Sequence, residues 1–122
     1  MSLTKLIEAV PQPHQSAPRI DTFAVIVRLM WIDGVIENDG EINRREISQA
    51  FGISTPQASL DLRRYMELNP GRIAYDVRGK RYVQVDGSRP LYKSAQQEAA
   101  AEMVRQVDAA ILRALEQEGR DG

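Results

Sequence analysis

Residues 43–66 read NRREISQAFGISTPQASLDLRRYM, and this stretch decides the fold. Asn43 and Ser54 are each followed three residues later by Glu or Gln, the spacing at which a cap side chain and the third helical residue can bond reciprocally. Between these two starts, Gly52 stands where a left-handed residue commonly ends a helix. Pro56 is tolerated because a first helical turn has no internal N–H bonds to lose. The stretch therefore predicts two short helices joined by a tight turn.

Each of these helices has one apolar side with helical spacing. The buried side of the first is expected from Ile47, Ala50 and Phe51, and that of the second from Ala58, Leu62, Tyr65 and Met66. The run 69–71, Asn-Pro-Gly, should end the second helix.

A hairpin is expected directly after this pair. Apolar residues alternate with others from Ile73 to Val77, and a second such run leads to Val85. Arg78 and Gly79 are predicted to form the tight turn between the runs. The tip of the hairpin would then be basic, with Arg78, Lys80 and Arg81.

The segment before residue 43 predicts a helix that Asp21 caps and that is apolar almost all round. Only Thr22, Arg28 and Asp33 interrupt its apolar surface before Gly34. Such a helix needs a second surface to pack against. It is either the central helix of the core or a helix whose second face meets a partner chain. A turn is expected at residues 38–40.

The chain is expected to divide into three parts. Residues 1–19 form an arm because prolines interrupt them, residues 20–92 form one domain, and residues 93–122 form a final helix that Ser94 caps. The apolar stripe of that helix follows helical spacing through Val104, Val107, Ile111 and Leu115, with alanines beside it.

Two capped helices, a glycine turn and a following hairpin are the parts of a winged helix-turn-helix domain. The predicted fold class is accordingly mainly α with a small β-hairpin, an α+β arrangement with an extra C-terminal helix. In such a domain the second helix can enter the major groove of double-stranded DNA. We expect a homodimeric transcriptional regulator that binds duplex DNA.

The candidate DNA-binding residues are polar or basic groups off the apolar stripes, with one exposed leucine. They are Arg44, Arg45, Ser54, Thr55, Gln57, Ser59, Leu60, Arg63, Arg64, Arg78, Lys80 and Arg81. Gln57 is the strongest candidate for reading a base, since glutamine can pair with adenine. Its alternative role is the return bond of a capping box. Arg64 could instead pair with Glu67 or Asp61.

A dimer interface is expected from the final helix together with the first. Its candidate residues are Phe23, Val27, Trp31, Val104, Val107, Ile111 and Leu115. Left exposed, the apolar stripe would favour aggregation. The alternative is that the final helix folds back over its own domain.

Composition limits the other classes of function. The net charge is −1, yet residues 41–85 hold 8 basic and 5 acidic side chains. There is no cysteine, and the single His14 lies in the expected arm, so we expect no metal site, no cofactor and no enzyme. No apolar run is long enough to cross a bilayer and no signal peptide is evident, which predicts a cytoplasmic protein without membrane contact.

Several motifs also suggest a family. Ile42-Asn43-Arg44, Phe51-Gly52-Ile53-Ser54 and the run 57–62, with Tyr65, Pro70, Tyr75-Asp76, Lys80 and Tyr82, resemble the N-terminal winged helix of bacterial WYL-domain transcription regulators, including those of phage-defence islands. The resemblance spans about residues 28–92. It implies a homodimeric repressor on an inverted-repeat operator, with Gln57, Ser59 and Arg63 on the reading helix.

The resemblance does not extend to the ligand-sensing WYL domain. A single amphipathic helix is predicted where that domain would begin, so no effector sensing is carried over and no small-molecule effector is evident. The competing function is an adaptor whose winged helix binds another protein, because fold alone does not decide between them. An adaptor should expose an apolar or aromatic patch on its reading helix or wing.

Overall fold

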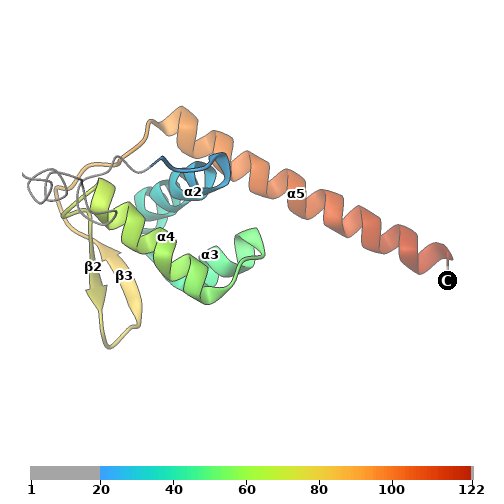
Figure 1. Cartoon of the computed structure of the whole chain (residues 1–122), viewed down its shortest axis with the longest axis horizontal. Coiled ribbons are helices and arrows are strands. Elements are labelled where there is room, and N and C mark those ends of the chain that lie inside the picture. Colours follow the sequence, from blue (N-terminus) through green and yellow to red (C-terminus); the bar gives the residue numbers. More distant parts are fainter. Residues whose placement is uncertain (1–19, 122) are drawn as a thin grey trace, which may run out of the picture.

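The computed structural model describes residues 20–121. Its elements, in chain order, are α2 (Phe23–Asp39), β1 (Glu41–Ile42), α3 (Arg44–Phe51), α4 (Thr55–Leu68), β2 (Ile73–Asp76), β3 (Arg81–Gln84) and α5 (Ser94–Asp121) (Figure 1). This mainly helical architecture with a small sheet confirms the predicted fold class. The expected arm, with His14, lies outside the described residues.

The predicted helix pair is confirmed, with the reciprocal cap present at the start of α3. The Asn43 side chain accepts a bond from the Glu46 backbone N–H at 2.9 Å, and the Glu46 carboxylate accepts from the Asn43 N–H at 3.2 Å. Gly52 ends α3 at φ 65°, a conformation that suits a residue without a Cβ. Ser54 then caps α4 through the Gln57 backbone N–H at 3.2 Å.

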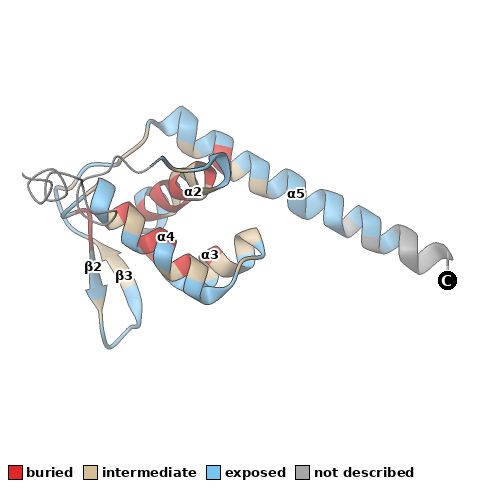
Figure 2. Cartoon of the chain, viewed as in Figure 1, coloured by how far each residue is buried: buried red, intermediate tan, exposed pale blue. Residues whose placement is uncertain are grey.

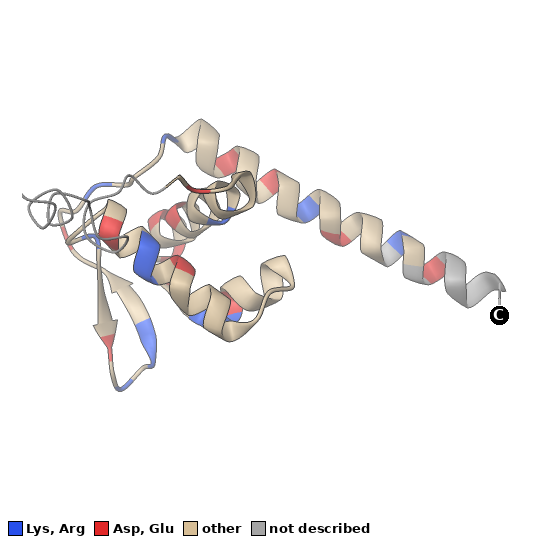
Figure 3. Cartoon of the chain, in the orientation of Figure 1, with Lys and Arg blue, Asp and Glu red and all other residues tan. Residues whose placement is uncertain are grey.

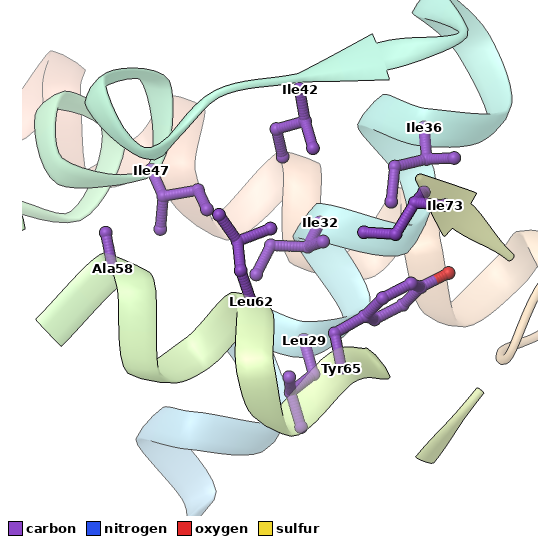
Figure 4. Close-up of a cluster of buried hydrophobic side chains, with 9 residues drawn as sticks. All are labelled: Leu29, Ile32, Ile36, Ile42, Ile47, Ala58, Leu62, Tyr65 and Ile73. Atoms are coloured by element: carbon purple, nitrogen blue, oxygen red, sulfur yellow. The ribbon is translucent and has the colours of Figure 1, made fainter. Parts of the chain in front are cut away.

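The core lies between α2, α3, α4 and the inner face of the sheet (Figure 4). Its side chains come from every element before the hairpin turn: Leu29, Ile32, Ile36, Ile42, Ile47, Ala58, Leu62, Tyr65 and Ile73. Helix α2 runs through the middle, with α4 on one side and α5 on the other (Figures 1 and 2). This position explains why α2 is apolar almost all round, and it supports the core interpretation of that helix.

The ends of α2 differ from the prediction. Thr22, and not Asp21, is the N-cap, because its hydroxyl accepts from the Val25 N–H at 3.3 Å while Asp21 binds Arg64. The helix continues through residue 38 to Asp39, and Gly40 ends it at φ 76°. Gly34 suits the middle of this helix because a Cβ there would lie 3.2 Å from the Cβ of Gln97 on α5.

The sheet has three strands in the order β1-β3-β2, and the two-residue strand β1 was not predicted. A strand of two residues is too short to show alternation. In the hairpin, Tyr75 pairs with Tyr82, with ring centroids 4.9 Å apart. Arg78 and Gly79 lie in the turn as predicted, but the connection is four residues long, 77–80, and its positive φ is at Lys80.

Helix α5 has two parts with different surroundings. Ala100, in its first part, is buried against α2, whereas the remainder extends beyond the other elements (Figures 1 and 2). Ser94 is its first helical residue and not its cap; the Gln96 side chain accepts from the Lys93 N–H at 2.9 Å instead. Within residues 20–121, no helix is both long and apolar enough to span a bilayer.

Asp33, fully buried on α2, joins these elements. One carboxylate oxygen accepts from the Tyr65 hydroxyl of α4 and from the Leu91 N–H at 2.9 Å. The other accepts from the Tyr92 N–H and from the Gln97 amide of α5, each at 2.8 Å. Burial, and then the bond to Asp33, raise the pKa of Tyr65, so its hydroxyl remains a donor.

Asp33→Ala is therefore expected to lower the free energy of unfolding by at least about 3 kcal/mol, because each buried donor left without an acceptor costs about 1 to 3 kcal/mol. Urea denaturation followed by circular dichroism measures the change. Asp86→Asn, at an exposed carboxylate, is the control and should change stability little. Equal, small changes in both variants would contradict the role of Asp33.

Candidate DNA-binding interface

Helix α4 buries one side and exposes the other (Figure 2). Ala58, Leu62 and Tyr65 face the core, while Thr55 and Arg63 are exposed. Leu60 is also on the outer side and is 48% exposed. Ser54 is exposed at the N-terminus, and Ser59 is half-buried. The outer surface of α4 thus offers short polar groups, one arginine and one apolar side chain.

Gln57 lies at the edge of this surface, half-buried. Its backbone N–H completes the Ser54 cap, but its side chain does not return a bond to Ser54. The Gln57 Nε2 instead donates to Oδ1 of Asp61, one turn later, at 3.1 Å. The capping-box alternative for this side chain is therefore wrong.

Asp61 is in turn bound to α2. Arg28 donates from Nε to Oδ2 at 2.6 Å and from Nη2 to Oδ1 at 3.2 Å. The two side chains are 2% (Asp61) and 11% (Arg28) exposed. From the sequence, Arg28 was expected only as an interruption of an apolar helix surface, and Asp61 only as an alternative partner of Arg64. The available signal was a lone arginine on an apolar helix, since a buried charge needs a partner.

Arg64 makes ion pairs within its own domain. It pairs with Asp21 at 2.9 Å and with Glu67 at 3.2 Å, and its side chain is 13% exposed. The geometry supports Glu67 as the partner of Arg64 and excludes Asp61. It points against Arg64 as a phosphate ligand.

The remaining basic candidates lie on α3, α4 and the β2–β3 hairpin (Figure 3), and they differ in whether an acidic side chain pairs with them. Arg81 pairs with Glu41 at 2.5 Å and approaches Asp76 at 3.6 Å, so part of its charge is neutralised within the domain. The other candidates are exposed, and no ion pair within residues 20–121 involves them: Arg44, Arg45, Arg63, Arg78 and Lys80. Cations near α4 and at the tip of the hairpin are thus available to an anionic partner.

A second candidate surface is an apolar groove of about 450 Å³ between the start of α2, the turn from α3 to α4, and α5. Of the expected interface residues, it brings together Phe23, Val27, Val104, Val107 and Ile111. Phe23 is 72% exposed, Val107 55% and Ile111 53%. We call this surface the α2–α5 groove.

Two expected interface residues are not part of this groove. Trp31 packs edge-on against Phe51 in its own domain, with ring centroids 5.5 Å apart. The side chain of Leu115 lies outside the described residues. Among the residues that the structure describes, no cluster of three metal-ligating His, Cys, Asp or Glu side chains occurs.

Along the chain, α3 is followed by the glycine turn, α4 and the β2–β3 hairpin. One side of α4 is exposed, and β1 adds a third strand to the sheet. This arrangement defines a winged helix-turn-helix domain. Residues 24–107 match the family described as the BrxR transcriptional regulator winged helix-turn-helix domain, and the chain belongs to this family. The match confirms the predicted resemblance to regulators of this kind.

Curated relatives share part of their sequence with this chain. The DNA-binding transcriptional repressor CapW of Escherichia coli strain KTE188 is 41% identical over 68 residues, which are 56% of this chain and 23% of the relative. Proteins of the same name from Pseudomonas aeruginosa and Stenotrophomonas maltophilia are 38% identical over 68 residues and 39% over 69. They too match over 23% of their own length.

Proposed function

We propose that this chain binds double-stranded DNA in a sequence-specific manner and acts as a transcriptional repressor in the bacterial cytoplasm. The observation that carries the proposal is the exposed outer surface of α4, in a domain of the BrxR family, beside cations that have no ion-pair partner among residues 20–121. The repressor name of its CapW relatives supports the same function. An exposed helix can enter the major groove, which displays a distinct pattern for every base pair.

The side chains divide into two roles. Thr55, Gln57 and Ser59 read base edges, and Leu60 suits the methyl group of thymine. Phosphate contacts come from the exposed cations of α3, α4 and the β2–β3 hairpin, which is the wing of the domain: Arg44, Arg45, Arg63, Arg78 and Lys80. Arg81 contributes less because Glu41 binds it. The helix dipole at Ser54 also favours a phosphate.

We further propose that two copies bind an inverted repeat, and that the α2–α5 groove is their interface. A two-fold arrangement would cover Phe23, Val107 and Ile111, which otherwise leave an apolar surface in water. It would also present two reading helices to one duplex. The first part of α5 belongs to the domain core through Gln97 and Ala100, so the interface involves its later part.

Binding to duplex DNA is expected to weaken steeply with salt, because each phosphate that a cation neutralises contributes about −0.9 to the slope of log K against log salt. Arg78→Ala combined with Lys80→Ala should make that slope shallower by up to about 2. Fluorescence anisotropy over a salt series measures both. Affinity that does not change with salt would exclude the phosphate contacts.

Gln57→Ala should reduce discrimination at particular base pairs, by about 1 to 3 kcal/mol if a paired contact to adenine is lost. Arg78→Ala should instead weaken binding to all sequences alike. Competition between duplexes selected from a randomised pool and their single-base variants separates the two effects. The same uniform loss in both variants would show that Gln57 does not read a base.

Val107→Asp is expected to convert a dimer into a monomer and to lower operator affinity about 100-fold or more, since the paired contact is lost. Light scattering gives the mass and anisotropy the affinity. Ala109→Asp places the same charge on an exposed position of α5 outside the groove and should remain dimeric. A monomeric wild type, or a dimeric Val107→Asp variant, would contradict this interface.

A further inference from the structure

A continuous chain of hydrogen bonds links α2 to the first turn of α4. Arg28 contacts both carboxylate oxygens of Asp61, at 2.6 and 3.2 Å, and Asp61 Oδ1 also accepts from the Gln57 amide at 3.1 Å. The two charged members are almost completely buried, at 11% and 2% exposure. The proposed reading of bases by Gln57 leaves this buried pair without a function.

The carboxylate determines which way the Gln57 amide points. An ionised carboxylate only accepts hydrogen bonds, so the NH₂ group, and not the carbonyl, must face Asp61. One of the two amide protons is used there, which leaves one N–H and the carbonyl oxygen of Gln57 available. A donor and an acceptor on one amide are the pair that matches N7 and N6 of adenine.

We propose that Asp61, held by Arg28, is a positioning residue that orients Gln57 for base discrimination. The inference rests on the proposed function, in which Gln57 reads a base. Glutamine loses much rotamer freedom when it is ordered, and a bond already present in the free protein reduces that loss on binding.

The geometry of α4 suits this role. Helical side chains lean toward the N-terminus, so Asp61 reaches back to Gln57 and does not draw the amide away from the exposed end of the helix. Arg28 also neutralises the charge of Asp61. The helix thereby uses a carboxylate near the proposed DNA surface without presenting an unpaired negative charge to phosphates.

The contact itself can be tested in the free protein. In ¹⁵N–¹H spectra, the side-chain amide protons of Gln57 should resonate apart from those of the exposed Gln49, and Asp61→Asn should move them toward those values. Asparagine leaves one acceptor oxygen for two donors, and the charged Arg28 competes better for it. Gln57 protons that already match exposed glutamines in the wild type would overturn the proposal.

The consequence for specificity is tested on duplexes that the wild type selects from a randomised pool. Asp61→Asn should lower the preference at one base pair by about fivefold or more, the smallest effect of losing a paired contact, with affinity for random duplex changed less than twofold. In a Gln57→Ala background, Asp61→Asn should have no further effect on preference. A purely structural role would produce the same loss on every duplex, or a loss that persists without Gln57.

Two further variants control the experiment. Glu67→Gln removes a different carboxylate of α4 and should leave base preference unchanged. If Asp61→Asn does not fold by circular dichroism, Arg28→Lys carries the test. Lysine keeps the charge but cannot contact both carboxylate oxygens in the planar manner of arginine, so a smaller loss at the same base pair is expected. Unchanged preference in Arg28→Lys would then overturn the proposal.

The outcomes separate this inference from the proposed function. A wild type that enriches no sequence refutes the proposed function and the positioning role together, whatever the amide spectrum shows. If the wild type enriches a sequence and the Asp61→Asn variant keeps the same base preference, only the positioning role is refuted.

Discussion

The carboxylate of Asp33 is the interaction on which the arrangement of the helices depends. It is fully buried and accepts hydrogen bonds from four donors, none of which is a cation. The donors belong to α4, to residues 91 and 92, and to α5. A buried carboxylate is costly unless it is hydrogen-bonded, so only a packing that brings all these donors together is stable. Asp33 thereby joins α2, which runs through the core, to both α4 and α5.

Two ion pairs between α2 and other parts of the domain act in a similar way. Arg28 binds Asp61 of α4, and Glu37 binds Arg72, which is 1% exposed and also donates to the Ser88 carbonyl at 2.9 Å. Breaking such a pair leaves an uncompensated buried charge, which is strongly destabilising. Apolar packing alone would let the elements slide, whereas these pairs define where α4 and the base of the wing stand relative to α2. The exposed surface of α4 therefore has a defined position relative to the wing cations.

Helix α5 packs against α2 in its first part and projects from the domain in its later part. Its first part is anchored by Gln97 and Ala100, and its later part leaves Val107 and Ile111 in water beside the exposed ring of Phe23. Because the helix is continuous, the anchored part determines where these apolar side chains lie relative to the domain. The alternative that this helix folds back over its own domain thus describes its first part, and the dimer interface expected from its later part stays a prediction.

The sequence by itself determined the local elements. Asn43, Gly52 and Ser54 specify caps and a turn through bonds within a few residues, and apolar spacing specifies which sides are buried, so the helix pair and the hairpin could be predicted. Apart from the pairing of Arg64 with Glu67, the tertiary structure alone decided the partners of the charged groups that matter here. Asp21 became the partner of Arg64 and not a cap, Gln57 bound Asp61, and Glu41 joined the sheet and reached Arg81. Some of these contacts join residues whose distance depends on how whole helices and strands pack. Others are one of several bonds that are all available locally. Spacing along the chain carries no information on either.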